Sequence, residues 1–187
     1  MNEKILGKVK KLKCVTCGRE YSPDEVEYTC PHCGPLLGTL DVLYNYPEIG
    51  RDFICREHFG HFRYLPILPI KQEFISPIQV GATPFYYAEK LGDYLGIPQL
   101  YLKDDGRNPS GSLKDRASSI GVAKALEKGK RVITAASTGN AASSLSLFAA
   151  LMDLDCRIFV PENAPEPKLA QLLVFGATVY AVKGTYD

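Results

Sequence analysis

The spacing of apolar and polar residues changes near Gly81, and beyond that point the chain alternates between a helical and a strand-like period. The apolar positions predict helices over residues 86–95, 115–128, 140–152 and 165–175, and strands over residues 99–103, 131–136, 156–160 and 178–182. Strands that alternate with helices across short links are typical of a parallel sheet. We therefore expect an α/β fold built on an open parallel sheet.

The helix expected over residues 115–128 has one mainly apolar side and is followed by Gly129, a residue type that commonly ends helices. This side is formed by Ala117, Ile120, Ala123, Ala125 and Leu126. We expect it to face the core.

The first 80 residues lack this alternation and divide into two parts. After a short lead-in over residues 1–12, residues 13–38 are dense in turn residues and have too few apolar positions for a core of their own. Residues 39–75 are rich in proline and aromatic side chains, which indicates an irregular arm. The expected organisation is a small module over 1–38, an arm over 39–80 and an α/β core over 81–187.

The chain of 187 residues has an ordinary globular composition, with 45% hydrophobic and 23% charged residues. Its net charge of +1 gives no broad positive field, which argues against a protein whose task is to bind nucleic acid. No apolar run approaches the roughly 20 residues of a membrane span, and the basic N-terminus is not followed by the apolar run of a secretory signal. We expect a cytoplasmic protein without a nucleic-acid or membrane partner.

Four of the six cysteines form two CxxC units, and twelve residues separate the units. Four thiolates can surround one zinc ion tetrahedrally, and a glycine after each unit lets the backbone turn tightly around the metal. The spacing predicts a structural zinc site in a zinc-ribbon-like module, formed by Cys14, Cys17, Cys30 and Cys33. Four reduced thiols without a metal are the alternative.

A zinc ribbon can also be a non-enzymatic module that binds a protein or a nucleic acid. A ribbon that binds nucleic acid is expected to carry a basic patch with exposed aromatic side chains. Residues 13–38 contain two basic and four acidic residues, namely Lys13 and Arg19 against Glu20, Asp24, Glu25 and Glu27. This balance argues against nucleic acid as the partner.

A polar, glycine-containing loop over residues 103–114 delivers Lys114 to the start of the helix expected from residue 115. A helix N-terminus carries partial positive charge, which disfavours the ammonium form of a nearby lysine. A neutral amine is what Schiff-base chemistry requires. The residues alone leave a second interpretation open, a solvated lysine beside the Asp115–Arg116 pair.

The sequence of residues 108–116, Asn-Pro-Ser-Gly-Ser-Leu-Lys-Asp-Arg, closely resembles the lysine motif of fold-type II pyridoxal-phosphate (PLP) enzymes, in the form usual for threonine synthases. Ser110 and Leu113 are mild departures, since the family commonly has threonine and phenylalanine there. Three further stretches resemble the family in order and spacing: residues 81–85 at the start of the catalytic core, residues 62–64 and 68–69 in the arm, with phenylalanine where tryptophan is usual, and residues 137–140 in the small domain.

The resemblance implies roles for individual residues. Lys114 would hold PLP as a Schiff base and, as the free amine, would move protons between substrate carbons. Ser137, Thr138 and Gly139 would bind the α-carboxylate of the substrate, and Asn140 would contact the phenolic oxygen of the cofactor. A plain helix N-cap is the alternative for this loop, and it is compatible with both roles.

The activity that the resemblance implies is that of a threonine synthase: a PLP-dependent lyase, in a homo-oligomer, that converts O-phosphohomoserine and water to threonine and phosphate. Cysteate synthase and threonine dehydratase are alternatives with the same fold, and the arm and the cysteines favour the synthases over the dehydratase. The family's glycine-rich phosphate loop and the hydroxyl residue at the pyridine nitrogen are not found. We therefore expect a truncated chain that is inactive alone and holds PLP weakly or not at all.

Overall fold

The computed structural model describes residues 9–45 and 53–184, and the chain forms two compact units. One unit comprises Met1–Glu57 and Arg63–Gln72, and the other comprises His58–Phe62 and Glu73–Asp187. Parts of three expectations, the lead-in, the arm and the end of the α/β core, fall on residues 1–8, 46–52 and 185–187 and lie outside the described residues.

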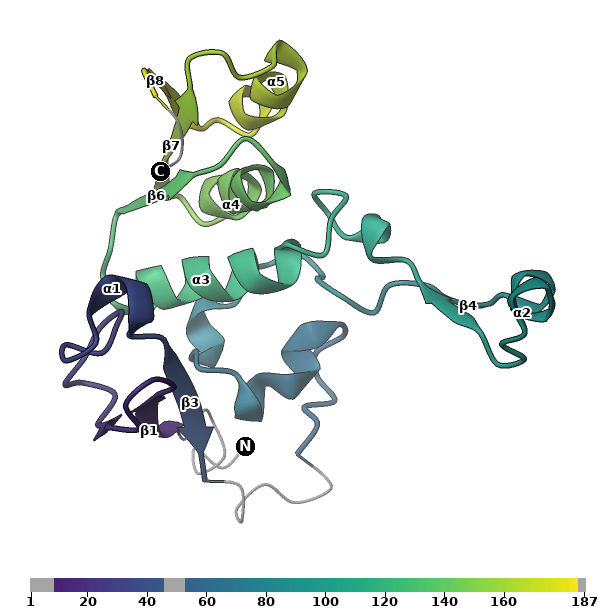
Figure 1. The fold of residues 1–187 in the computed structure, drawn as a ribbon, viewed down its shortest axis with the longest axis horizontal. Helices are drawn as coiled ribbons and strands as arrows, with labels where there is room; N and C mark the ends of the chain where they lie inside the picture. The colour runs from purple at the N-terminus through teal and green to yellow at the C-terminus, as the bar shows by residue number, and fades with distance from the viewer. Residues whose placement is uncertain (1–8, 46–52, 185–187) are drawn as a thin grey trace. The chain divides into compact units, whose positions relative to one another are not determined.

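The first unit contains a three-stranded antiparallel sheet, of which β1 and β3 are labelled in Figure 1. Strand β1 (Val9–Cys14) lies between β2 (Glu20–Tyr21) and β3 (Leu40–Tyr44), and the short helix α1 (Gly34–Leu37) precedes β3. We call residues 9–45 the cysteine module. Its sheet begins inside the expected lead-in and continues past residue 38, because Leu40 pairs with Cys14 and Val42 with Leu12.

The second unit contains a three-stranded parallel sheet in the order β6-β7-β8, which confirms the expected α/β fold. The strands are β6 (Val132–Ala136), β7 (Asp155–Pro161) and β8 (Thr178–Val182), and the helices are α3 (Asp115–Glu127), α4 (Asn140–Leu151) and α5 (Glu166–Val174). Each differs from its expected bounds by at most one residue. Three short 3-10 helices lie earlier in the chain: η2 (His61–Ile67), η3 (Gln72–Phe74) and η4 (Asp105–Arg107).

The core of the second unit lies on one face of the parallel sheet, where α4 packs on β7 and α5 on β8 (Figure 1). Alternate residues of β7 are buried, as a strand with one covered face requires. The buried side chains of this core include Cys156, Ile158 and Val160 of β7, Phe148 of α4 and Leu172 of α5. None of the described helices is long and apolar enough to cross a membrane.

The helix expected over residues 86–95 is partly wrong, because the segment begins as a strand. Strand β4 (Phe85–Tyr87) pairs antiparallel with β5 (Tyr101–Lys103), and helix α2 (Glu89–Leu95) lies between them. Aromatic residues favour strands, and the rings of Phe85 and Tyr101 stack across the pair at a centroid distance of 4.9 Å. The expected strand over 99–103 accordingly starts two residues later.

The expected apolar side of α3 is confirmed only in part: Ala123 is buried and Ile120 is half-buried. Ala117 is exposed, whereas Ala125 and Leu126 are only partly buried. The buried residues of α3 are Asp115, Ser119, Val122 and Ala123. Two of these four, Asp115 and Ser119, are polar and can be buried because each has hydrogen-bond partners inside the unit. The pattern of apolar residues therefore could not identify the buried face of α3.

Candidate active site and metal centre

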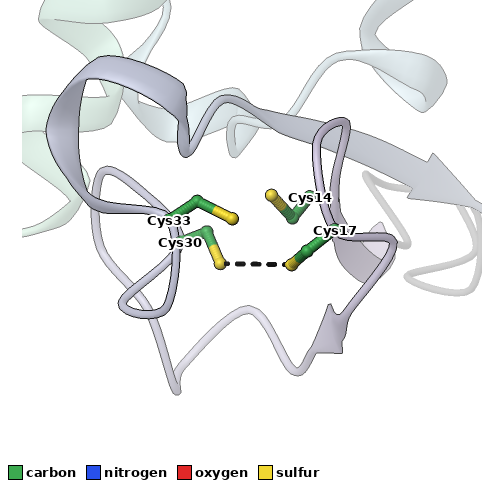
Figure 2. A group of neighbouring side chains, drawn as sticks. All are labelled: Cys14, Cys17, Cys30 and Cys33. Carbon is green, nitrogen blue, oxygen red and sulfur yellow. Dashed lines mark hydrogen bonds between the residues drawn. The ribbon is translucent and has the colours of Figure 1, made fainter.

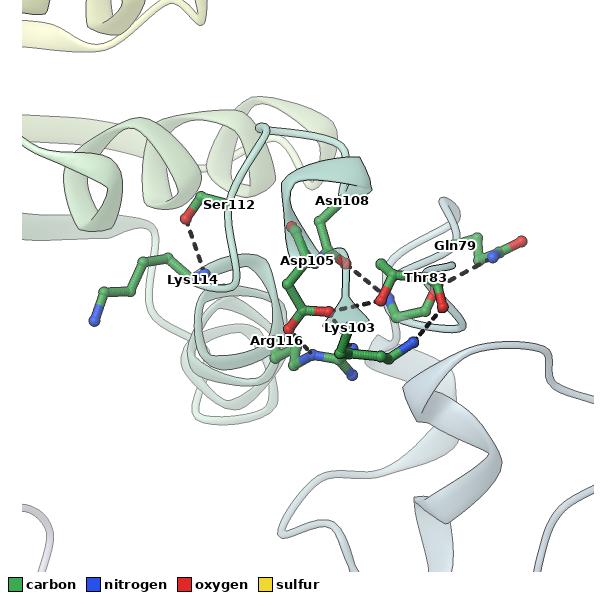
Figure 3. Close-up of polar contacts among 9 residues, drawn as sticks. Gln79, Thr83, Lys103, Asp105, Asn108, Ser112, Lys114 and Arg116 are labelled. Atoms are coloured by element: carbon green, nitrogen blue, oxygen red, sulfur yellow. Dashed lines mark hydrogen bonds and ion pairs between the residues drawn. The ribbon is translucent and has the colours of Figure 1, made fainter. Parts of the chain in front are cut away.

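Lys114 occupies the N-cap position of α3, at the end of the polar loop. Its backbone N–H donates to the hydroxyl of Ser112 (3.0 Å), and Gly111 turns the loop with a φ of 77°, a conformation that favours glycine. The Lys114 side chain is exposed and extends away from the polar group around Asp105 (Figure 3). Within residues 9–45 and 53–184, no hydrogen bond or ion pair engages its amine.

A polar network fixes the loop from its other side (Figure 3). The guanidinium of Arg116 donates to both carboxylate oxygens of Asp105 (2.9 and 3.1 Å), and the Thr83 hydroxyl donates to the same carboxylate (2.6 Å). The Arg116 and Thr83 bonds hold the pKa of Asp105 down at about 2. The Asn108 side chain accepts from the backbone N–H of Gly81 (2.9 Å), so residues 81–83 are tied directly to the lysine loop.

Gly81 has no room for a side chain. A Cβ atom built there would lie 2.7 Å from a guanidinium nitrogen of Arg116, and φ is 76°. The glycine of the stretch 81–85 therefore allows the backbone to approach the arginine of the lysine motif.

Asp115, the residue after Lys114, is a part of the site that the sequence analysis missed. Its side chain is fully buried. It accepts from the backbone N–H of Ser110 (2.7 Å), from the Ser110 hydroxyl, and from the Ser144 hydroxyl on α4 (2.6 Å). The serines of α4, a mainly apolar helix, were the available signal, because a buried hydroxyl needs a partner.

The loop of Ser137, Thr138 and Gly139 joins the carboxyl end of β6 to the first turn of α4. Gly139 is the N-cap of α4, in extended conformation, and its N–H donates to the Ser137 hydroxyl (3.1 Å). Asn140 is exposed at the first helical position. The first turn of a helix leaves N–H groups without helical partners, and such groups at the carboxyl end of a parallel strand commonly bind anions.

The two predicted parts of the site are connected through α3 and α4, which pack against each other. Ser144 lies four residues after Asn140, hence on the same face of α4 one turn along. Its bond to Asp115 joins that face to the residue beside Lys114. The start of α3 is thereby fixed to the first two turns of α4.

The four cysteines of the two CxxC units converge in the cysteine module (Figure 2). Their Sγ atoms all lie within 4.8 Å of one another, and those of Cys17 and Cys30 are 3.8 Å apart. Two sulfurs bound tetrahedrally to zinc at about 2.3 Å lie about 3.8 Å apart, whereas a disulfide is about 2 Å long. The spacing therefore suits a shared metal ion and excludes disulfides.

The backbone folds around the sulfurs in the way that the two glycines predict. Gly18 and Gly34 each follow a CxxC unit with a φ of 72°. Their N–H groups donate to the carbonyls of Cys14 and Cys30, both at 2.9 Å. Each unit is thus a closed turn that directs both of its sulfurs to one side.

Hydrogen bonds adjust the protonation of the thiols. Burial acts to raise the pKa of Cys30, but hydrogen bonds from the Tyr21 hydroxyl and the backbone N–H groups of Cys33 and His32 bring it down to about 6. Burial and the neighbouring sulfurs raise the pKa of Cys33. The lowered pKa of Cys30 favours its thiolate, the form that binds metal.

One family profile, described as pyridoxal-phosphate dependent enzyme, matches residues 77–187. The chain belongs to this family. The match covers more than half of the chain and includes both the lysine loop and the loop before α4, so the resemblance seen in the sequence is confirmed at the level of the family.

Curated relatives agree with this assignment. The chain is 40% identical over 179 residues to a threonine synthase of Methanosarcina acetivorans and 40% identical over 181 residues to one of Methanocaldococcus jannaschii. Each alignment covers 94% of this chain but only 43% and 44% of the two relatives. The chain therefore spans less than half the length of these relatives.

Two solved structures share the fold over about half of this chain. The processed form of threonine deaminase isoform 2 from Solanum lycopersicum superposes with a TM-score of 0.51 at 27% identity, over 56% of this chain and 29% of that one. A pyridoxal 5'-phosphate-dependent aspartate racemase superposes with a TM-score of 0.50 at 25% identity, over 54% and 32% of the two chains.

Proposed function

We propose that this chain serves the reaction of a threonine synthase, the conversion of O-phosphohomoserine and water to threonine and phosphate. The supporting observation is the position of Lys114. Its amine is exposed, has no partner among the described residues and lies at the N-cap of α3. A hydrogen bond joins α3 to α4, the helix that follows the Ser137–Gly139 loop. Both relatives at 40% identity are threonine synthases. The proposal concerns a protein of their length, of which this chain spans 43–44%.

The residues present fit a PLP cofactor. A Schiff base with PLP needs a lysine amine that is not held in an ion pair with a carboxylate. The carboxylates nearest in sequence to Lys114 have other partners: Asp115 binds two serines and Asp105 binds Arg116. When bound, PLP withdraws electrons from the substrate and so makes protons on its carbons removable. Asn140 stands at the start of α4 and would contact the cofactor's phenolic oxygen.

The chain's own residues then orient the substrate and move protons. Free N–H groups at the first turn of α4, with Ser137 and Thr138, would bind the substrate α-carboxylate. The Lys114 amine would take a proton from one substrate carbon and return it to another. Both roles need Lys114 and the loop before α4 at a fixed separation.

A chimera tests the proposed activity. The chain is joined to the part of the Methanosarcina acetivorans threonine synthase that lies beyond the matched region, and threonine and phosphate are measured with O-phosphohomoserine. We expect equal amounts of both products. The Lys114→Ala chimera should be inactive, whereas Lys124→Ala, which loses an ion pair with Glu127, should retain activity. A folded chimera that makes neither product would contradict the proposal.

Threonine deamination is the second candidate, because one of the structures with a TM-score above 0.5 is a threonine deaminase. The same chimera distinguishes the two reactions, since a deaminase releases ammonia from threonine without needing a phosphorylated substrate. Ammonia formation from threonine, without phosphate release from O-phosphohomoserine, would favour deamination.

We further propose that Cys14, Cys17, Cys30 and Cys33 hold one structural zinc ion. Four sulfurs within 4.8 Å fill a tetrahedral site and leave no open position for a substrate. His32 is not part of this group. A cytoplasmic location agrees with a cluster of reduced thiols, and we propose that the active protein is a homo-oligomer, as the resemblance implies. One zinc per chain by elemental analysis is the expected result for protein purified without chelator.

A further inference from the structure

The buried carboxylate of Asp115 in the second unit has no role in the proposed reaction steps. A buried charge is costly unless hydrogen bonds replace its lost hydration. Its three donors are neutral: the Ser110 N–H, the Ser110 hydroxyl and the Ser144 hydroxyl. Ser144 is itself fully buried, so solvent does not compete for this bond.

These bonds join segments that lie far apart in sequence. Ser110 belongs to the loop that leads to Lys114, and Ser144 belongs to α4, twenty-nine residues beyond Asp115. The carboxylate therefore fixes the lysine loop against α4 rather than merely capping its own helix. We call Ser110, Asp115 and Ser144 the Asp115 clamp.

We propose that the Asp115 clamp positions Lys114 relative to the Ser137–Asn140 loop. The Ser144–Asp115 bond sets the separation of the two helix starts, and the two Ser110 bonds set the path of the loop. Asp115 and Ser144 are positioning residues, which act through Lys114 and touch no substrate. The consequence for chemistry rests on the proposed function, whereas the ordering of the loop does not.

Hydrogen exchange on the 187-residue chain tests the clamp without any cofactor. Ser144→Ala removes the bond between the helices, and Asp115→Asn replaces the charged acceptor. Both changes should accelerate amide exchange in residues 108–114 by about tenfold, the equivalent of roughly 1.4 kcal/mol, and the Ser110 amide should change most. The matched control is Ser143→Ala, because Ser143 is also buried on α4 but donates to Gln171 on α5 (3.0 Å).

A second measurement is the selectivity with which PLP attaches to Lys114. A variant that only destabilised the fold would not be expected to change this selectivity. The chain is incubated with PLP and reduced with borohydride, and the share of adduct on each lysine is measured by mass spectrometry. We expect Ser144→Ala to lower the share on Lys114 several-fold, and Ser143→Ala to leave it unchanged even if both lower the melting temperature equally.

The outcomes separate the clamp from the proposed function. The clamp would be overturned if residues 108–114 exchanged at the same rate in the unsubstituted chain and in both the Ser144→Ala and Asp115→Asn variants. It would also be overturned if the Ser143→Ala control accelerated exchange as much as these variants. Adduct spread evenly over all lysines of the unsubstituted chain would contradict the role of Lys114 instead, while faster exchange in the variants would still support the clamp.

Discussion

In the cysteine module, the buried apolar or sulfur-containing side chains are Cys14, Val26 and Cys30, and two of these are proposed metal ligands. In the parallel-sheet region, large apolar side chains from three elements fill the core instead, among them Phe148, Ile158 and Leu172. The cysteine module therefore has a sulfur cluster at its centre, whereas the parallel-sheet region has an apolar core. The two regions should therefore respond to different perturbations.

Metal removal should have the largest effect and should act on the cysteine module alone. Structural zinc contributes about 10–16 kcal/mol of apparent binding free energy in small zinc domains. Chelation should therefore abolish amide protection in β1 and β3 while α4 and β7 stay protected. Hydrogen exchange with and without a strong chelator measures both regions at once.

Cysteine variants supply the control for metal removal. Cys17→Ser should lower zinc content and protection together, whereas Cys55→Ser, outside the cluster, should change neither. Loss of protection in α4 upon chelation would show that the two regions do not differ as described.

A cavity in the parallel-sheet core should give the converse result. Phe148 is fully buried on α4, and Phe148→Ala should lower the free energy of unfolding of this region by about 3–5 kcal/mol. Zinc content should stay at one per chain. Urea unfolding followed by circular dichroism, with metal release followed in parallel, checks the prediction; simultaneous loss of metal and helix would contradict it.

Acid should also weaken the second unit, through His61. Burial, together with the charge of Arg116, lowers the pKa of His61 to about 4, and its Nε2 lies 3.1 Å from the Ser119 hydroxyl. Since this pKa lies below the ordinary value of 6.5, the neutral form stabilises the fold above pH 6.5, and that stability is lost as the pH falls towards 4. The loss should amount to at most about 3 kcal/mol.

The variant His61→Gln isolates this effect, because glutamine can keep a bond to Ser119 without taking up a proton. Its free energy of unfolding should depend less on pH between 6.5 and 4 than that of the unsubstituted chain. Identical pH profiles for the two chains would contradict the assignment to His61.

The elements predicted correctly from sequence are those with long, regular patterns. Helices α4 and α5 and strands β6 to β8 follow the expected bounds within a residue, and on β7 the buried residues alternate as the strand pattern requires. The pairing of β3 with β1 was missed, because it depends on turns around the cysteines that bring Leu40 beside Cys14. Such long-range contacts leave no local period.

The same limit applies to the candidate site. Lys114 and the loop before α4 were found through residue types at fixed spacing, which a sequence displays directly. One partner of Asp115, Ser144, is twenty-nine residues away on a helix with three buried serines, and spacing does not show which serine Asp115 binds. The exposure of Ala117 was missed for a related reason: buried polar residues on α3 shift its inward face.

The most direct test of the central claim is the site of cofactor attachment. The 187-residue chain is incubated with excess PLP, reduced with borohydride, digested, and searched for the modified peptide. The account predicts adduct mainly on Lys114, even if binding is weak, and none at that position in a folded Lys114→Ala chain. Adduct mainly on Lys103 or Lys124, or an unchanged yield after Lys114→Ala, would contradict the claim that Lys114 holds the cofactor.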